Sequence, residues 1–411
     1  MLKRPCYQYL WETLSKDRKI ILISGPRQSG KTTFSQSLGE RFPNNIYFNW
    51  DAPSSKKMFL RDPAFFEKMD RKDDSAPLVI LDEIHKYKRW KNYLKGIYDE
   101  FKGRYHFLVT GSGRLDLWEK GGEALTGRYM PMNLFPLTLS ELSKNKRNLA
   151  DFKKNPLRDF DGNPVSQTKD IWNQLLKFGG FPEPFVKSKE DFLTRWSESY
   201  ARQIIRDDIR SVFDLKDIAN MELLYALLPS KSGSPISLNN IAQDLGVAFD
   251  TVKNWLRIFD LFYLVFSVST WTPKISRSIL KEKKLYFFNV PEVEEEGPRF
   301  ENLIALELHK SIALWNQAGL GQFKLHYLRN KDGEEADFLI ANKNVPILLV
   351  ETKWNDENVS KSLIRFQNQL QVPAAQLVKK EGIFRRIKNG DLEILVVTAH
   401  RWLSSLPDLS S

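Results

Sequence analysis

The sequence predicts an α/β protein with a parallel sheet in its amino-terminal third, and three observations lead to this expectation. The chain has 411 residues, which is long for one ordinary domain and favours two to three. Hydrophobic residues make up 42% of it, enough for each domain to bury a core. Over the first ~140 residues, short apolar runs alternate with amphipathic stretches, a pattern typical of a parallel sheet covered by helices.

Five apolar runs are the expected strands of this sheet: residues 19–24, 45–49, 78–82, 106–110 and 129–134. A charged stretch over residues 143–170, punctuated by proline and glycine, indicates a linker or surface insertion. Helical patterning follows, then a short module near residues 237–271 and a last α/β stretch from residue 301. We therefore expect four segments: 1–142, 143–215, 216–295 and 296–411.

Composition narrows the class of protein. The net charge of +11 permits contact with nucleic acid or another polyanion, and equally serves solubility. No run approaches the ~20 apolar residues that cross a bilayer, and the first residues lack a secretory signal pattern. The lone Cys6 cannot form an internal disulfide, and the five histidines are scattered. These features predict a cytoplasmic protein that does not contact a membrane.

A phosphate-binding loop follows the first expected strand. Residues 25–32 read GPRQSGKT and match G-x-x-x-x-G-K-S/T between the run KIILIS and the helical stretch TTFSQSLGERF. Gly25 and Gly30 would let backbone N–H groups turn toward phosphates at a helix N-terminus. Lys31 is expected to reach the β- and γ-phosphates of ATP, and the Thr32 hydroxyl to ligand Mg²⁺. The full set of expected nucleotide-binding residues is Gly25, Pro26, Arg27, Gln28, Ser29, Gly30, Lys31, Thr32 and Thr33.

Polar side chains end two further strands. The run LVILDE ends in Asp82 and Glu83; beside a phosphate-binding loop, the first would hold magnesium and the second would position and deprotonate the attacking water. The run HFLVTGS ends at Thr110 and Ser112. We expect this strand to lie between the other two, where Ser112 would sense the γ-phosphate, although TGS is also an ordinary turn.

Two arginines follow this strand. Arg114 or Arg128 could neutralise charge on the transferred phosphoryl group, in the same chain or across a subunit interface that would require an oligomer. Each could equally be a surface arginine. Arg128 is the preferred candidate because Gly127 frees the backbone beside it.

The short module predicts a helix-turn-helix. Residues 237–259 read SLNNIAQDLGVAFDTVKNWLRIF, with a serine to cap the first helix and a glycine at the turn. The second helix would expose Lys253, Asn254 and Arg257, which could contact DNA phosphates or bases. Modules of this kind also bind proteins or only connect domains.

A second group of carboxylates lies near the C-terminus. Asp337 opens one expected strand, and Glu351 and Lys353 share one face of the next. Two carboxylates can bind Mg²⁺ while a lysine orients or activates water. This D…E-x-K arrangement resembles the PD-(D/E)xK nuclease fold, in which an upstream helical glutamate, here Glu301, often joins the metal ligands; Gln367 is a weaker candidate. Such short patterns also arise by chance.

Together, GPRQSGKTT, LVILDEIHKYKRWKNYLKGIYDE, FLVTGSGRLDL and GRYMPMNLFPLTLSEL resemble the AAA+-type ATPases of bacteria and archaea that carry an uncharacterised C-terminal domain. The resemblance includes GGFPEPF at residues 179–185 and implies a P-loop core with an additional strand, a central winged-helix segment and a nuclease-like C-terminal fold. Asn289 stands where relatives usually have an aspartate, which puts the role of that position in doubt here.

Three functions are compatible with these residues. The first is a Mg²⁺-dependent ATPase that couples its nucleotide state to DNA or to a partner protein. The alternatives are a metal-dependent DNA endonuclease gated by ATP, and a non-enzymatic DNA-binding regulator in which nucleotide only sets the conformation.

Overall fold

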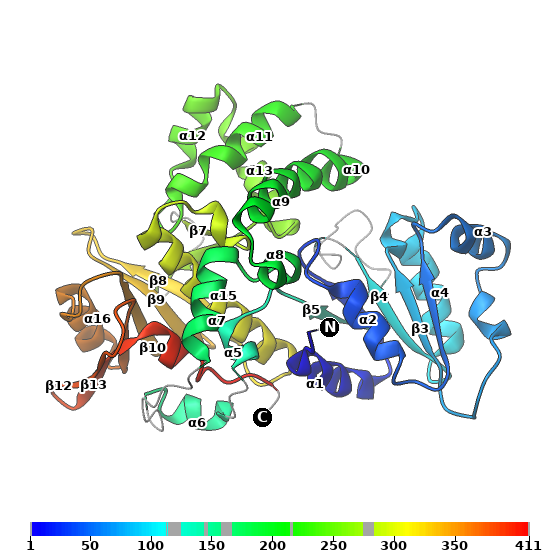
Figure 1. The fold of residues 1–411 in the computed structure, drawn as a ribbon, viewed down its shortest axis with the longest axis horizontal. Helices are drawn as coiled ribbons and strands as arrows, with labels where there is room; N and C mark the ends of the chain where they lie inside the picture. The colour runs from blue at the N-terminus through cyan, green and yellow to red at the C-terminus, as the bar shows by residue number, and fades with distance from the viewer. Residues whose placement is uncertain are drawn as a thin grey trace. The chain divides into compact units, whose positions relative to one another are not determined.

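The computed structural model describes residues 2–111, 113, 125–143, 147–157, 167–213, 217–273 and 283–409. The chain divides into two compact units. Figure 1 shows the chain coloured from blue at the N-terminus to red at the C-terminus. The first contains Met1–Phe135 with Leu261–Tyr263, and the second contains Pro136–Asp260 with Leu264–Ser411. Each unit has its own sheet and its own core.

The first unit is built on a five-stranded parallel sheet of order β2-β3-β4-β1-β5. Its strands are β1 (Ile20–Ser24), β2 (Asn45–Asn49), β3 (Leu78–Asp82), β4 (His106–Thr110) and β5 (Tyr129–Asn133). They agree with the five predicted runs to within one residue. As expected, β4 lies between the strand before the phosphate-binding loop and the strand that ends in Asp82.

Burial explains why these strands were recognisable in the sequence. The inner strands β1 and β3 are buried at every position, as strands covered on both faces must be. The edge strands β2 and β5 are only partly buried. Pro131 lies in β5, where the missing N–H costs little because an edge strand has a neighbour on one side only.

Helices cover both faces of this sheet; they are α1 (Pro5–Leu14), α2 (Lys31–Gly39), α3 (Pro53–Arg61) and α4 (Trp90–Phe101). Alternate strand residues such as Leu22 and Val79 join an aromatic-rich core with Phe59 of α3 and Phe101 of α4. On the opposite face, Gly39 of α2 lies close to the side chain of Ile80.

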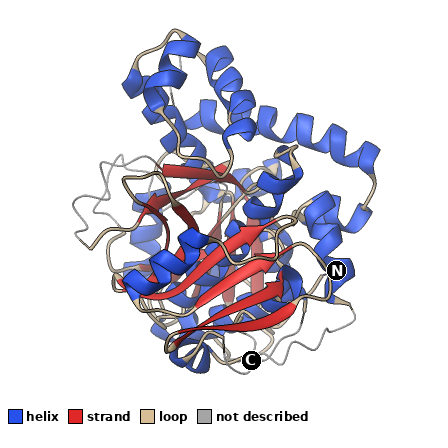
Figure 2. Ribbon diagram, turned by 90° about the vertical axis from the view of Figure 1, so that its left-hand side faces the viewer, coloured by secondary structure: helices blue, strands red, loops and turns tan. Residues whose placement is uncertain are grey.

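The second unit contains an eight-stranded mixed sheet of order β12-β13-β11-β10-β9-β8-β6-β7. Its strands are β6 (Val265–Thr270), β7 (Lys283–Phe287), β8 (Phe323–Arg329), β9 (Glu335–Asn342), β10 (Val345–Lys353), β11 (Ala374–Val378), β12 (Phe384–Asn389) and β13 (Leu392–Thr398). Figure 2 looks onto these strands. The long helix α15 (Glu296–Gln317) contacts β7, β8 and β10, while α16 (Lys361–Leu370) contacts β9 and β10.

The other helices of this unit are α5 (Leu139–Leu142), α6 (Leu149–Lys154), α7 (Thr168–Phe178), α8 (Pro182–Lys187), α9 (Glu190–Gln203), α10 (Arg210–Val212), α11 (Ile218–Leu227), α12 (Leu238–Leu245), α13 (Phe249–Leu261) and α17 (Ala399–Leu403). A π-helical segment, Ile204–Ile209, joins α9 to α10. In Figures 1 and 2, helices α9 to α13 gather on one side of the sheet.

Two features differ from the predicted segments. The expected linker contains α6, whose Phe152 is fully buried against Trp315 and Trp402. Strands β6 and β7 lie within the expected segment 216–295, but they hydrogen-bond into the same sheet as the strands of 296–411. Such pairing joins residues far apart in the sequence, so composition along the chain does not reveal it. No helix in the described ranges combines the length and the apolar character that crossing a bilayer requires.

Candidate functional site

The phosphate-binding loop leaves the buried strand β1 and enters α2 at Lys31. Gly30 precedes the helix with φ 96°, a left-handed conformation that glycine adopts without strain, and no described side chain caps the first turn. A Cβ on Gly25 would lie 2.1 Å from the carbonyl oxygen of Leu134, so only glycine fits this close approach. The N-terminus of α2 therefore presents backbone N–H groups suited to an anion.

Lys31 is held over the loop. Its Nζ donates hydrogen bonds to the carbonyl oxygens of Gly25 at 3.0 Å and Pro26 at 2.7 Å, and the side chain is buried. These contacts place the ammonium group beside the loop that carries the predicted nucleotide-binding residues.

Asp82, at the end of β3, accepts hydrogen bonds from residues of three other elements. Thr32, on α2, donates a hydrogen bond from Oγ1 to Asp82 Oδ2 at 2.9 Å, and Tyr47, on β2, donates from its hydroxyl to the same oxygen at 2.5 Å. Thr110, at the end of β4, donates to the other oxygen, Oδ1. Asp82 is 1% exposed. The predicted pair Thr32 and Asp82 thus lies together, and Tyr47 is an additional partner.

Glu83 follows in a left-handed backbone conformation, with φ 57°, which a residue with a side chain rarely adopts. Its carboxylate lies 3.3 Å from Lys86 Nζ and 3.6 Å from His85 Nε2, and Lys86 also contacts Asp51 Oδ2 at 2.5 Å. Burial raises the pKa of Glu83, and the charges of Lys31 and Lys86 partly offset this.

Sequence reasoning did not identify Tyr47 and Lys86. The i,i+3 spacing of Glu83 and Lys86 was a usable signal, whereas the contact of Tyr47 with Asp82 depends on the pairing of β2 with β3. Ser112 and Arg114 lie outside the described residues. Their predicted roles stay predictions.

Arg128 lies at the wrong end of the sheet for a role in the phosphate site of its own chain. Its carbonyl oxygen accepts the N–H of Ile20, at the start of β1, while the loop begins after Ser24 at the end of that strand. The five-residue strand spans about 13 Å between these points. The guanidinium group instead makes two hydrogen bonds to Asp99, at 2.8 and 3.1 Å.

Helices α12 and α13 occupy the region of the predicted helix-turn-helix. Ser237 caps α12 by accepting a hydrogen bond from the N–H of Asn240, and the chain turns through Gly246 into α13. Lys253, Asn254 and Arg257 are exposed on α13, as predicted. They line a pocket of about 960 Å³, together with residues of α12, β6 and β7. DNA contact by these residues stays a prediction.

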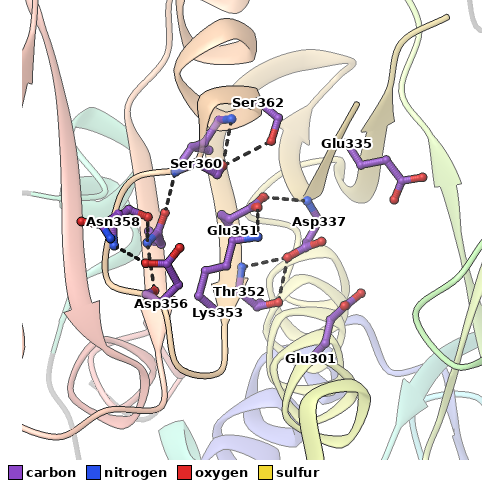
Figure 3. A network of polar contacts seen from close by, with 12 residues as sticks. Glu301, Glu335, Asp337, Glu351, Thr352, Lys353, Asp356, Asn358, Ser360 and Ser362 are labelled. Atoms are coloured by element: carbon purple, nitrogen blue, oxygen red, sulfur yellow. Dashed lines mark hydrogen bonds and ion pairs between the residues drawn. The ribbon is translucent and has the colours of Figure 1, made fainter. Parts of the chain in front are cut away.

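The C-terminal carboxylates also come together. Antiparallel pairing of Phe338 with Val350 places Asp337 beside Glu351, whose Oε2 accepts the N–H of Asp337 at 3.4 Å. Lys353 Nζ lies 2.8 Å from Glu351 Oε1. Figure 3 shows these side chains on neighbouring strands, with Glu301 reaching toward them from α15. Burial, together with the charge of Asp337, raises the pKa of Glu351 to about 7 and that of Glu301 to about 8.

Two further positions named in the sequence analysis, Gln367 and Asn289, make hydrogen bonds elsewhere. Gln367 is buried and donates from Nε2 to the carbonyl oxygen of Glu393 at 2.8 Å, so it belongs to the packing of α16 on β13. Asn289 donates to Ser197 at 3.2 Å and to Glu292 at 2.9 Å. Within the described ranges, no group of three His, Cys, Asp or Glu side chains is arranged to hold a metal ion. Lys284, which sequence reasoning missed, lies among the carboxylates instead.

Comparison with known families gives three matches along the chain. An AAA domain matches residues 17–143, a domain of unknown function (DUF8612) matches residues 169–290, and a second domain of unknown function (DUF4143) matches residues 296–398. The AAA match covers the whole five-stranded sheet, including the loop at residues 25–32.

Similar proteins occur in archaea and bacteria. The uncharacterized protein MJ1544 of Methanocaldococcus jannaschii is 23% identical over 407 residues, which cover 94% of this chain and 88% of that protein. The uncharacterized protein Rv2008c of Mycobacterium tuberculosis is 22% identical over 352 residues, 84% of this chain and 72% of that protein.

Two solved structures show a weak likeness. A chain in the structure of Drosophila ORC bound to AT-rich DNA and Cdc6 is 10% identical, with a TM-score of 0.23, over 69% of this chain and 88% of that chain. The structure of C. elegans PCH-2 is 16% identical, with a TM-score of 0.25, over 61% and 67%. Likenesses this weak say nothing about a ligand or partner of this chain.

The AAA match and the geometry of the loop lead to the same coarse statement. The match over residues 17–143 and the parallel sheet with its phosphate-binding loop support a P-loop fold for the first unit and a nucleotide-binding, ATPase-like function. The other two matches, over residues 169–290 and 296–398, are to domains of unknown function and indicate no activity for the second unit.

Proposed function

We propose that this protein binds ATP with Mg²⁺ at residues 25–33 and hydrolyses it. The observation that carries the proposal is the hydrogen bond of 2.9 Å between Thr32 and Asp82. It joins α2, the helix that follows the phosphate-binding loop, to β3, the strand that ends at Asp82. A hydroxyl and a carboxylate at this junction are the residue types that P-loop enzymes use for magnesium.

The residues present fit the nucleotide and the ion. Backbone N–H groups at the start of α2 suit the phosphates. Thr32 and Asp82 offer the oxygen atoms that Mg²⁺ prefers, and they would hold an ion whose charge offsets that of the β- and γ-phosphates. Hydrogen bonds from Tyr47 and Thr110 keep the Asp82 carboxylate in one orientation.

Lys31 and Glu83 have separate tasks in the proposed reaction. Lys31 would exchange its two carbonyl partners for phosphate oxygens, which carry full negative charge and are stronger acceptors. Glu83 would accept the proton of the attacking water on its carboxylate. The nearby Lys31 and Lys86 favour the ionised form that such a base requires.

Phosphate release tests this assignment. We expect purified wild type to release phosphate from ATP with Mg²⁺, and Lys31→Met to lose both ATP binding and release. Lys57→Met removes an exposed lysine of α3 in the same unit and is the matched control. Equal ATP binding by Lys31→Met and wild type would contradict the proposed phosphate site.

Coupling to DNA is a second candidate function, supported by the exposed Lys253, Asn254 and Arg257 of α13. Loss of two phosphate contacts should weaken binding and reduce its dependence on salt. We expect Lys253→Ala/Arg257→Ala to bind duplex DNA more weakly than Lys324→Ala/Lys388→Ala, which removes the same charge elsewhere on the second unit.

Phosphate release with and without DNA separates the proposed targets. Stimulation by DNA would support a nucleic-acid target. If the protein does not bind DNA even at low salt, the proposed coupling of ATP hydrolysis is to a partner protein and not to DNA.

A further inference from the structure

A buried lysine lies among the C-terminal carboxylates. Lys284, on β7, is 1% exposed, and lysine is almost never buried to this extent unless it is paired. Its Nζ lies 3.3 Å from Glu335 Oε2, 3.5 Å from Glu301 Oε1 and 3.6 Å from Asp337 Oδ1. One ammonium group therefore faces three carboxylates, which come from α15 and β9.

Other groups of the chain donate hydrogen bonds to two of these carboxylates. Asp337 Oδ2 accepts hydrogen bonds from the N–H and the hydroxyl of Thr352, at 2.8 and 2.7 Å (Figure 3). Glu301 Oε1 accepts the hydroxyl of Tyr286 at 2.7 Å. Asp337 Oδ2 and Glu301 Oε1 are thus engaged by protein donors in addition to the contacts with Lys284.

A second cation at this position would be costly. The D…E-x-K pattern would require Mg²⁺ within about 2.1 Å of the carboxylate oxygens, and an ion there would lie a few ångströms from the Lys284 ammonium group. Two cations repel strongly at that separation in a buried environment. Burial by itself would lower the pKa of Lys284, but Glu301, Asp337 and Glu335 together raise it, so the lysine keeps its charge.

We propose that Lys284 takes the place of the divalent cation in this cluster. Glu301, Asp337 and Glu335 then form a permanent ion cluster around the ammonium group, and the second unit has no metal-dependent nuclease centre. The cluster joins β7, β9 and α15, and its role is to hold these elements together. The proposal does not depend on ATP hydrolysis, because it concerns only residues of the second unit.

Binding of Mn²⁺ to the full chain without nucleotide tests the proposal. Asp82→Asn removes the P-loop metal ligand, so the C-terminal cluster can be measured in that background. We expect Asp82→Asn and Asp82→Asn/Asp337→Asn to bind the same amount of Mn²⁺ by electron paramagnetic resonance. If Asp82→Asn binds a saturable equivalent of Mn²⁺ that Asp82→Asn/Asp337→Asn does not bind, the proposal is overturned.

Removing the Lys284 ammonium group should create a binding site for a divalent cation among the carboxylates. In the same background we expect Lys284→Met to gain one equivalent of Mn²⁺, which Asp337→Asn then abolishes. Lys284→Arg keeps the positive charge and should gain none. A folded Lys284→Met variant that gains no Mn²⁺ would overturn the proposal. If Lys284→Met unfolds, Mn²⁺ should restore its circular dichroism spectrum, and failure to restore it would be equally contradictory.

Discussion

We expect Glu307 to make the stability of the second unit depend on pH, and glutamine at this position to remove that dependence. The side chain of Glu307, in α15, is fully buried and accepts the N–H of Leu139 at 2.5 Å and that of Ser140 at 3.5 Å. Burial raises its pKa from 4.5 to about 7; these N–H groups and Lys310 act against the rise, and Glu141 adds to it.

The sign and size of the pH dependence follow from the difference between the pKa of Glu307 in the folded state and in the unfolded state. The folded state binds the proton more tightly than the unfolded state, so the stabilisation is complete below the unfolded pKa and is lost as the pH rises through about 7. At about 1.36 kcal/mol per pKa unit, the free energy of unfolding should fall by about 2 kcal/mol between about pH 5.5 and about pH 8.5. Glu307→Gln keeps an acceptor for Leu139 but has no proton to lose.

Urea unfolding, followed by hydrogen exchange of peptides from α15, would report on this unit. We expect Glu307→Gln to gain about 2 kcal/mol relative to wild type over that pH range, while the exposed Glu294→Gln gives a constant difference. If the free energy of unfolding of Glu307→Gln also differs from that of wild type by a constant amount, Glu307 is ionised over the whole pH range and the reasoning is refuted.

Three further substitutions test other parts of the structure. Gly25→Ala should weaken ATP binding at least about tenfold, because its Cβ would meet a backbone oxygen, whereas Gly96→Ala, with open space around it in α4, should not; equal affinities by calorimetry would contradict this. Lys86→Gln removes a charge that lowers the pKa of Glu83, so the acid limb of the phosphate-release profile should move to higher pH, and an unchanged limb would count against Glu83 as the base. Lys310→Met removes the buried ion pair with Glu141 and should lower the free energy of unfolding by about 3 kcal/mol in urea titrations; a loss below about 1 kcal/mol would show that the pair is dispensable.

Much of the first unit could be predicted because its information is local. The buried strand β1, the loop with Gly30 and Lys31, and the helix α2 follow one another along the chain, so motif and hydrophobic pattern identify them together. Thr32 and Asp82 were both predicted to hold Mg²⁺, which requires that the two side chains lie close together. Their contact at 2.9 Å agrees with that reasoning.

The remaining features depend on long-range pairing. Arg128 was assigned from the glycine beside it, but the register of β5 on β1 places it at the amino ends of the strands. Lys284 looks like any charged residue in the sequence, and only the sheet and α15 together reveal it among carboxylates. Gln367 was expected near those carboxylates because it follows them in sequence, yet its amide bonds β13 instead.

Glu83→Gln is the sharpest test of the proposal that this chain hydrolyses ATP with Glu83 as the base. Glutamine has the size of glutamate and keeps a polar contact for Lys86, but it cannot accept the proton of the attacking water. We expect the variant to bind ATP with Mg²⁺ as tightly as wild type and to release phosphate at least about 100-fold more slowly. Release at the wild-type rate by a variant that binds ATP normally would contradict it.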